Sequence, residues 1–328
     1  MISLCMIAID EALLLEQCLS SVKDLVSEII VVVDDRSSDA TVAIAQKFGA
    51  KVVMRKWNDD FSAARNASLA LATQPWILVL DGDEVLDVQD HDRIRALVKR
   101  DDHVGYSFVQ KTYTNDNSLA NFMSGGDDLL HKSFKGFMLC NIVRLFKNDA
   151  SFRFVGPVHE YIEDSLFAKG LIGVTSILIH HYQELKGVSF FREKQLKYLE
   201  LYEKNIAAYP NQARAYRHMG NLYYTFVHDF VKAKECFEKS LLLKKNPDTF
   251  VGLAWCYMQL KDFVKAEEVL KEGLAVKRDH PLLWISRGKL YILTGKPRAA
   301  RTCFENVLKL GHNPVVQDML DHLNRVLG

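Results

Sequence analysis

The sequence predicts an α/β domain with a mostly parallel sheet over residues 1–186, followed by an all-α repeat array over residues 187–328. Three observations support this division. The chain has 328 residues, which is long for a single hydrophobic core. Short apolar runs alternate with helical patterns in the first part of the chain. Near residue 188 the strand patterns stop, and a helical pattern with a fixed period begins.

The elements of the first domain alternate between strand and helix. Apolar runs rich in Val, Ile and Leu predict strands at residues 2–9, 28–35, 50–54 and 76–81. Amphipathic segments between them predict helices at residues 11–25, 40–49 and 61–73. Because the apolar runs are continuous, we expect the strands to be covered on both faces. Strand–helix–strand order then implies a parallel sheet with right-handed crossovers.

Acidic residues follow three of these strands, as Asp10 and Glu11, Asp34 and Asp35, and Asp81 and Asp83. Parallel sheets bind ligands outside the carboxyl ends of their strands. Asp81 and Asp83 flank Gly82 and would face the same way on an extended backbone. Hard divalent cations such as Mg²⁺ and Mn²⁺ prefer carboxylate oxygens and often bridge them to phosphates. The pattern predicts a metal and diphosphate site, and the alternative is an acidic turn that caps a helix near residue 90.

The second domain contains three similar segments, at residues 213–246, 247–280 and 281–314. A small residue (Gly220, Ala254, Gly288) and a tyrosine (Tyr223, Tyr257, Tyr291) recur in them every 34 residues. The first segment carries one extra residue in its turn. This period matches the tetratricopeptide helix–turn–helix unit. We also expect a joining helix at residues 189–209 and a capping helix at 315–327. Such arrays bind peptides or partner proteins, and a surface for packing or homo-oligomer formation is the alternative.

Composition narrows the class of protein. The formal net charge of +1 gives no reason to expect a nucleic-acid partner. No apolar segment approaches the roughly 20 residues that span a bilayer, and acidic residues interrupt the apolar opening, so we expect neither a membrane span nor a secretory signal. The six cysteines are scattered, as is typical of reduced thiols, and the expected location is cytoplasmic.

Four segments of the first domain together resemble a known family. They are "SLCMIAIDEALLLEQCLSSV", "IIVVVDDRSSDATVAIA", "FSAARNASLALAT" and "WILVLDGDE", in that order. The chain over residues 1 to about 182 is similar to the glycosyltransferases of the GT-A fold, in particular the inverting family 2 enzymes. The resemblance implies a nucleotide-diphospho-sugar donor, most simply a UDP-sugar, and an Mg²⁺ or Mn²⁺ cofactor.

The resemblance also implies roles for individual residues. Asp34 or Asp35 would hydrogen-bond the base or ribose, and Arg65 would lie near the diphosphate. Asp81 would contact the ribose or the metal, and Asp83 would ligate the metal. Ile7, Ala8 and Gly82 would line the donor site. The alternative for Arg65 is a surface salt bridge to Asp59 or Asp60.

Two positions depart from the family pattern. Asp10 stands where the family usually has Asn. Arg36 stands where a glycine usually follows the acid pair, so the turn there must differ or must tolerate a side chain.

An inverting transferase also needs a general base, and one carboxylate near the sugar is sufficient. The chain resembles subgroup members that carry an "RLF" run followed by "HE", here in "CNIVRLFKN" and "FRFVGPVHEYI". From this resemblance we expect Glu160 to be the base, with Asp127 and Asp128 as rivals. In the alternative, Glu160 only starts a helix. The strand-like "TSILIHHY" ends in two histidines, and the resemblance implies that one of them ligates the metal. His181 is our choice.

The sequence therefore predicts a metal-dependent, inverting glycosyltransferase that transfers a sugar to a peptide or protein held by the repeats. Alternatives are a glycan or cell-envelope polysaccharide acceptor, a receiver-like phosphoacceptor, and a non-catalytic scaffold. The leading strand and helix have no place in a receiver domain. A sugar nucleotidyltransferase is disfavoured because the loop after the first strand is acidic and lacks glycine.

Overall fold

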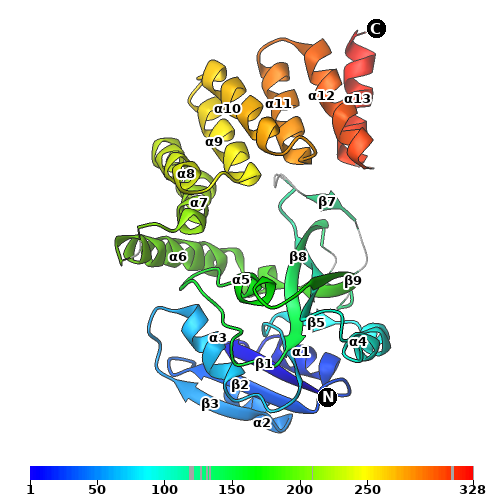
Figure 1. Cartoon of the computed structure of the whole chain (residues 1–328), viewed down its shortest axis with the longest axis vertical. Helices are drawn as coiled ribbons and strands as arrows, with labels where there is room; N and C mark the ends of the chain where they lie inside the picture. Colours follow the sequence, from blue (N-terminus) through cyan, green and yellow to red (C-terminus); the bar gives the residue numbers. More distant parts are fainter. Residues whose placement is uncertain are drawn as a thin grey trace. The chain divides into compact units, whose positions relative to one another are not determined.

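The computed structural model describes residues 1–117, 122–125, 128–130, 132, 134–208, 210–311 and 314–327. The chain divides into two compact units, Met1–Phe191 and Arg192–Gly328 (Figure 1). The first unit is an α/β structure built on one sheet, and the second is a run of helices. The predicted α/β and all-α classes are confirmed, but the sheet is mixed rather than mostly parallel.

The strand order of the sheet is β3-β2-β1-β4-β8-β6-β9-β5, with β7 paired to β8. The first four of these strands form the parallel part: β1 Ile2–Ala8, β2 Glu28–Asp34, β3 Lys51–Arg55 and β4 Trp76–Val79. In a receiver domain the strand that ends in the acid pair would neighbour the strand that ends in the third acid. Here β1 lies between β2 and β4, so the receiver alternative is wrong.

The rest of the sheet has mixed directions. It consists of β5 Glu84–Leu86, β6 Gly105–Thr114, β7 Met123–Ser124, β8 Gly136–Lys147 and β9 Ile172–His181. The pairs β4–β8, β6–β8, β5–β9 and β7–β8 are antiparallel, and β6–β9 is parallel. β5 and β9 pair at the far end of this order, and their pairing places the end of β9 beside the turn that follows β4.

The helices of the first unit are short. They are α1 Leu15–Val22, α2 Thr41–Lys47, α3 Phe61–Leu69, α4 His91–Leu97 and α5 Glu163–Phe167, with 3-10 turns η1 Val88–Asp90 and η2 Gln183–Lys186. The predicted segment 61–73 begins as a helix because the Asp60 carboxylate accepts the Ala63 N–H at 3.0 Å. Buried Leu15 and Leu19 of α1 pack in one core with Leu4 and Leu78 of the strands.

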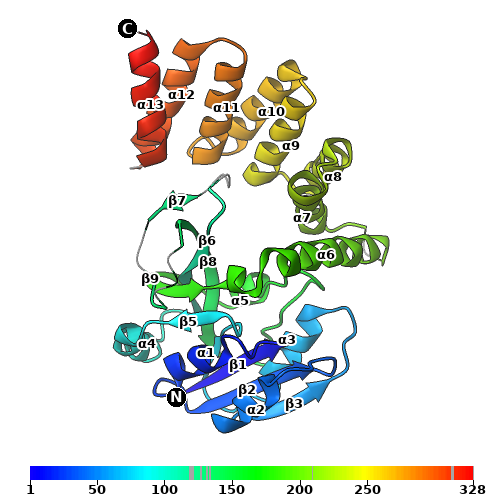
Figure 2. The ribbon, with the colours of Figure 1, turned by 180° about the vertical axis from the view of Figure 1, so that it is seen from behind.

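The helix α6 Val188–Ala208 begins in the last residues of the first unit and continues into the second. The second unit continues as an array of helices, α7 Ala213–Leu222, α8 Phe230–Leu243, α9 Pro247–Gln259, α10 Phe263–Val276, α11 Pro281–Leu293, α12 Pro297–Leu310 and α13 Pro314–Leu327. Figure 2 shows α7 to α13 side by side in chain order. The extra residue of the first repeat is absorbed by a π-helical turn, η3 Tyr223–Val227, which ends at His228 with φ of 59°.

The small residues of the repeats have a packing reason. A Cβ atom on Gly220 would lie 2.9 Å from the Phe237 ring, and one on Gly288 would lie 2.5 Å from the Phe304 ring. Each aromatic ring comes from the second helix of the same repeat. The glycines therefore allow the two helices of a repeat to approach closely.

Candidate functional site

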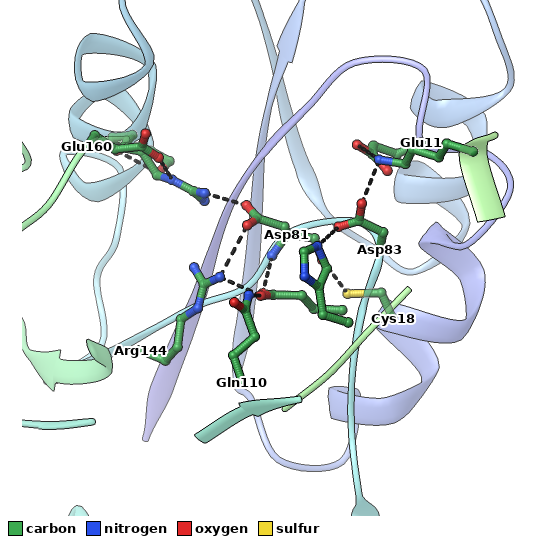
Figure 3. A network of polar contacts seen from close by, with 12 residues as sticks. Glu11, Cys18, Asp81, Asp83, Gln110, Arg144 and Glu160 are labelled. Atoms are coloured by element: carbon green, nitrogen blue, oxygen red, sulfur yellow. Dashed lines mark hydrogen bonds and ion pairs between the residues drawn. The ribbon is translucent and has the colours of Figure 1, made fainter. Parts of the chain in front are cut away.

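Five carboxylates from three segments of the chain belong to one polar network at the carboxyl ends of β1 and β4 (Figure 3). They are Glu11, Asp81, Asp83, Glu84 and Glu160. Figure 3 shows Asp81 and Asp83 near its centre, with Glu160 on the Asp81 side and Glu11 on the Asp83 side. Of the three acidic strand ends expected from the sequence, those after β1 and β4 therefore contribute to this network.

The acids after β4 lie in a tight turn. The N–H of Glu84 donates to the carbonyl of Asp81 at 3.1 Å, and Gly82 and Asp83 form the corner. The turn replaces the extended backbone that was expected, so the two aspartates have separate partners. The alternative in which they cap a nearby helix is wrong, because Asp87 caps the turn that precedes α4.

Gly82 is required by its neighbour Glu11. A Cβ atom at position 82 would lie 2.8 Å from both Cβ and Cγ of Glu11. Contacts this short do not occur between unbonded carbon atoms. A glycine between the two aspartates therefore allows the Glu11 side chain to lie directly against the turn.

Asp81 is held by two arginines. Its Oδ1 pairs with Nη2 of Arg65, and its Oδ2 lies 3.2 Å from Nη2 of Arg144. Burial would raise the pKa of this carboxyl group, but the two guanidinium groups outweigh burial and hold the pKa well below its usual range. The side chain is 33% exposed, so it remains accessible from solvent.

Arg65 of α3 joins Asp81 to the expected base. Its Nε donates to Oε1 of Glu160 at 2.9 Å. The alternative in which Arg65 pairs with Asp59 or Asp60 is wrong, since the salt bridges of Arg65 are to Asp81 and Glu160. The buried Nη1 of Arg65 has no hydrogen-bond partner in the described part of the chain. A buried guanidinium N–H without an acceptor suits a ligand that supplies oxygen atoms.

Glu160 lies in a loop closed by the Val155–Tyr161 bridge. The Phe61 N–H donates to the carbonyl of Pro157 at 3.0 Å, which ties this loop to the start of α3. The next helix begins only at Glu163, so the alternative in which Glu160 starts a helix is wrong. Its partly buried carboxylate is linked to Asp81 through Arg65, which contacts both side chains.

The rivals of Glu160 lie elsewhere or cannot be placed. Asp127 lies outside the described residues. Asp128 is buried, and its carboxylate accepts the N–H of Leu130 at 3.0 Å and that of Lys132 at 2.8 Å. Both contacts are within its own loop, and the Tyr182 hydroxyl donates to Oδ1 of Asp128 at 3.4 Å. The described contacts therefore favour Glu160 over Asp128, although the assignment of a base stays a prediction.

Asp83 is paired with His181 and Lys186. Its Oδ1 lies 3.5 Å from Nε2 of His181, and its Oδ2 lies 2.8 Å from Nζ of Lys186. Burial would raise the pKa of Asp83, but His181 and then Lys186 outweigh it and lower the pKa. Burial would also lower the pKa of His181, and the Asp83 carboxylate reverses that effect and raises it.

The two neighbouring histidines face opposite ways, as the strand period requires. His181 pairs across the ladder with Glu84, and its Nδ1 lies 3.1 Å from Oγ1 of Thr112. His180 lies away from the acids, with Nδ1 2.6 Å from the hydroxyl of Tyr113. The structure thus brings His181, and not His180, to Asp83.

Glu84 and Arg144 were not identified as site residues from the sequence. Glu84 is fully buried, and its Oε1 accepts from Nη2 of Arg144 and from Nε2 of Gln110, both at 2.5 Å. Its Oε2 accepts the N–H of Asp81 at 2.8 Å. Glu84 stands in the acidic run itself, and Arg144 stands in the "RLF" segment. Nothing in the sequence around either residue predicts that Glu84 and Arg144 form an ion pair.

The second acid pair lies at the end of β2. Arg36 binds Asp34 through two contacts, Nε to Oδ1 at 2.9 Å and Nη2 to Oδ2 at 2.6 Å, and its guanidinium lies over the Trp57 ring. Burial would raise the pKa of Asp34, but the hydrogen bonds from Arg36 lower it. Asp35 is exposed, and its carboxylate accepts the Trp57 N–H at 3.4 Å. Asp35 is therefore the more accessible of the two for a nucleotide.

The two departures from the family pattern are both accommodated. Arg36 does not have a positive φ, so no glycine is needed at its position. Asp10 has φ of 49°, and its Oδ1 accepts the Ser38 N–H at 2.8 Å. Ile7 and Ala8 end β1 opposite the last residues of β2, next to this turn. Their predicted contact with a donor stays a prediction.

A divalent cation would have few protein donors here. Among the described residues, no three His, Cys, Asp or Glu side chains are grouped as metal ligands. Asp83 and His181 offer one carboxylate and one imidazole nitrogen. Mg²⁺ commonly takes one or two carboxylates and completes its shell with water and substrate phosphates. The five carboxylates also exceed the three permanently charged cations Arg65, Arg144 and Lys186 by two charges, so the donor set fits such a cation together with a diphosphate.

Comparisons with known proteins agree with the two-unit division. The family model of glycosyl transferase family 2 matches residues 3–146, and a tetratricopeptide repeat model matches residues 227–290. Among the described residues, no helix combines the length and the apolar character needed to cross a membrane.

Several curated proteins are similar to parts of the chain. The TPR repeat-containing protein Synpcc7942_0270 of Synechococcus elongatus is 40% identical over 51% of this chain and 36% of its own length. An uncharacterized glycosyltransferase of Rickettsia felis is 39% identical over 29% of this chain and 33% of its own length. The glycosyltransferase SunS of Bacillus subtilis prophage SPbeta is 28% identical over 47% of this chain and 33% of its own length. The chain thus spans about a third of the length of these relatives.

Among solved structures, the first TPR of Spaghetti (RPAP3) bound to an HSP90 peptide is 25% identical, covers 35% of this chain and 92% of that one, and has a TM-score of 0.33. The thermophilic TPR protein TTC0263 of Thermus thermophilus is 18% identical, covers 42% of this chain and 77% of that one, and has a TM-score of 0.38.

Proposed function

We propose that the family 2 glycosyl transferase domain at residues 3–146, completed by Glu160, His181 and Lys186, transfers a sugar from a nucleotide-diphospho-sugar to an acceptor with inversion. The donor proposed is a UDP-sugar. One observation carries the proposal: a buried arginine, Arg65, bridges Asp81 at the end of β4 and the base candidate Glu160. A phosphate-binding group and a proton acceptor are thus adjacent at the carboxyl end of the sheet.

Arg65 suits the donor diphosphate. Its Nη1 is buried and lacks an acceptor in the described residues, and a phosphate oxygen would provide one. Asp83 and His181 would hold the Mg²⁺ or Mn²⁺ that accompanies the diphosphate. That cation would offset the negative charge on the leaving diphosphate. Asp35, which is exposed, would contact the base or ribose.

Glu160 would remove the proton from the attacking acceptor hydroxyl. In this structure its carboxylate accepts the Nε–H of Arg65 at 2.9 Å, so it is engaged by the guanidinium group. A diphosphate on Nη1 that also draws Nε of Arg65 away from Glu160 would leave the carboxylate available as a base. Donor binding would therefore precede activation of the acceptor.

The acceptor proposed is a peptide or protein held by the repeats, and charge suggests which kind. Residues 192–328 contain 23 Lys and Arg against 15 Asp and Glu. A surface with this excess of positive charge attracts acidic segments and repels basic ones. Matched acceptor peptides of opposite charge test this idea: the acidic peptide should have the lower KM at low salt. Equal KM values, or activity on glycans only, would reject it.

The donor class is tested by thermal shift with nucleotide diphosphates and their sugars, with and without Mn²⁺. We expect UDP to stabilise the full chain only in the presence of the metal, and Asp83→Ala to abolish this gain. Stabilisation by UDP that is equal in Asp83→Ala would reject the metal role. No stabilisation by any nucleotide diphosphate would reject the donor class.

A further inference from the structure

Lys186 already supplies a positive charge to the expected metal ligand. Its Nζ lies 2.8 Å from Oδ2 of Asp83 and 2.6 Å from Oε1 of Glu11. The Lys186 side chain is only 11% exposed, and both carboxylates are similarly buried. The ammonium group thus bridges Glu11 and Asp83 and offsets part of their negative charge.

The backbone around Lys186 is anchored to the sheet. Lys186 ends η2, and the N–H of Gly187 closes that turn on the carbonyl of Glu184 at 3.0 Å. The Glu184 carboxylate accepts the hydroxyl of Thr114 and the N–H of Asn115, at the end of β6. These contacts fix the turn that carries Lys186, so its position beside Asp83 is set by the fold and is not an accident of a long side chain.

A metal ion and this ammonium compete for the same carboxylate. Asp83 and His181 would hold a divalent cation, and Nζ of Lys186 lies 2.8 Å from Oδ2 of the same aspartate. Like charges at this separation repel, and burial strengthens the repulsion relative to water. The two cations can coexist when a diphosphate brings compensating negative charge into the site.

We propose that Lys186 is a built-in competitor of the divalent cation at Asp83, so that metal binds tightly only together with the nucleotide diphosphate. The inference rests on the proposed function, since it assumes that a metal and a diphosphate share this site. Its consequence is an order of events. Without the nucleotide, repulsion from the Lys186 ammonium weakens metal binding. The negative charge of the diphosphate offsets this repulsion and allows the metal to bind.

The test measures Mn²⁺ binding directly. Electron paramagnetic resonance counts free Mn²⁺ in titrations of the full chain, with and without UDP. Lys186→Gln should bind Mn²⁺ without UDP at least about ten-fold more tightly than the natural protein. The extra affinity that UDP confers should shrink by the same factor. Lys186→Arg keeps the charge and should behave like the natural protein.

A matched control is Lys47→Gln. Lys47 also pairs with a glutamate at 2.6 Å, Glu16, but on an exposed surface. This variant should bind Mn²⁺ as the natural protein does. Because Lys186→Gln leaves two buried acids without their cation, circular dichroism must show that it is folded. If it unfolds, the double variant Glu11→Gln with Lys186→Gln removes one acid as well, and it should bind Mn²⁺ more tightly than Glu11→Gln alone.

Two results would overturn the inference, and they differ in meaning. Equal or weaker Mn²⁺ binding in the folded Lys186 variants, with tight binding to the UDP complex retained, shows that Lys186 only supports Asp83. Failure of the natural protein and of every variant to bind Mn²⁺ even with UDP rejects the metal-dependent function itself, and the inference with it.

Discussion

The two units of this protein use charge in opposite ways. Residues 1–191 contain 26 Asp and Glu against 19 Lys and Arg, whereas residues 192–328 have the reverse excess, with 15 acids and 23 bases. The formal net charge of +1 conceals this difference. In the first unit Arg65, Arg144 and Lys186 pair with acids in a buried network. In the second unit, pairs such as Lys265–Asp262 and Arg301–Glu305 are exposed.

The spacing of the contacts differs as well. In the first unit Arg65 meets a glutamate 95 residues away, and Lys186 meets one 175 residues away. In the second unit a tyrosine hydroxyl donates to a glutamate in each repeat, at separations of 19 to 24 residues, in the pairs Tyr223–Glu203, Tyr257–Glu238 and Tyr291–Glu267. Repeat arrays gain stability from such nearest-neighbour contacts. The site, in contrast, depends on segments that only the complete fold brings together.

The largest effect should follow from removing Arg144. Its guanidinium is 5% exposed and contacts both Asp81 and the fully buried Glu84. Arg144→Met would leave buried negative charge without a partner, which destabilises a protein by about 3–5 kcal/mol. Urea unfolding of the N-terminal unit measures the loss. Arg301→Met removes an exposed pair with Glu305 in the repeats and should cost less than about 1 kcal/mol. An equal decrease in the free energy of unfolding in the two variants would show that buried and surface ion pairs contribute alike.

The next effect concerns catalysis. Glu160→Gln keeps the shape of the side chain and removes its ability to accept a proton. We expect kcat for sugar transfer to fall by about 10²–10⁴-fold, while the stabilisation by UDP and Mn²⁺ is retained. Asp128→Asn is the matched variant, because the Asp128 carboxylate holds the backbone of its own loop. If Asp128→Asn loses the activity and Glu160→Gln keeps it, the base is misassigned.

A smaller effect should appear with pH. Burial lowers the pKa of His180 to about 4, from an ordinary value of 6.5. The unfolded chain therefore takes up a proton that the folded chain refuses as the pH falls from about 6.5 to about 4. The folded state loses stability over that window, on the order of 3 kcal/mol, and the loss levels off at lower pH.

His180→Gln should flatten this dependence, measured as the free energy of unfolding of the first unit at each pH. His228→Gln, at an exposed position in the repeats, is the control and should leave the dependence unchanged. A pH dependence that is identical in the natural protein and in His180→Gln would show that other groups cause the loss.

Local patterns made most of the fold predictable. The strand Ile2–Ala8 and the helix pairs of the repeats follow from apolar periodicity and from the 34-residue recurrence of Gly220 and its equivalents. The mixed half of the sheet was not predicted, because the direction in which β8 pairs with β4 depends on a long connection rather than on either strand.

The site was predictable only in its acids. Asp81 and Asp83 stand in a recognisable run, and resemblance to a family pointed to Arg65, Glu160 and His181. The partners of these residues were not predictable, since nothing in the residues around Lys186 indicates that it lies beside Asp83. The fold decides which distant residues form an ion pair, whereas a sequence motif identifies only one residue of the pair.

The smallest effect should follow from removing one of the repeated tyrosine hydroxyls. The Tyr257 hydroxyl donates to Oε1 of Glu238 at 2.7 Å, so Tyr257→Phe removes a charge-assisted hydrogen bond between neighbouring repeats. We expect a loss of about 1–2 kcal/mol in the unfolding of the repeats and no change in binding of UDP. Tyr224→Phe is the matched control, because the Tyr224 hydroxyl accepts a longer contact, 3.4 Å from an uncharged donor, Gln259. Its loss should cost less. The tyrosine–glutamate pairs of the repeats and the contacts of the site share no residues, so we expect the two to act independently. A change in UDP binding in Tyr257→Phe would show instead that the repeats influence the site.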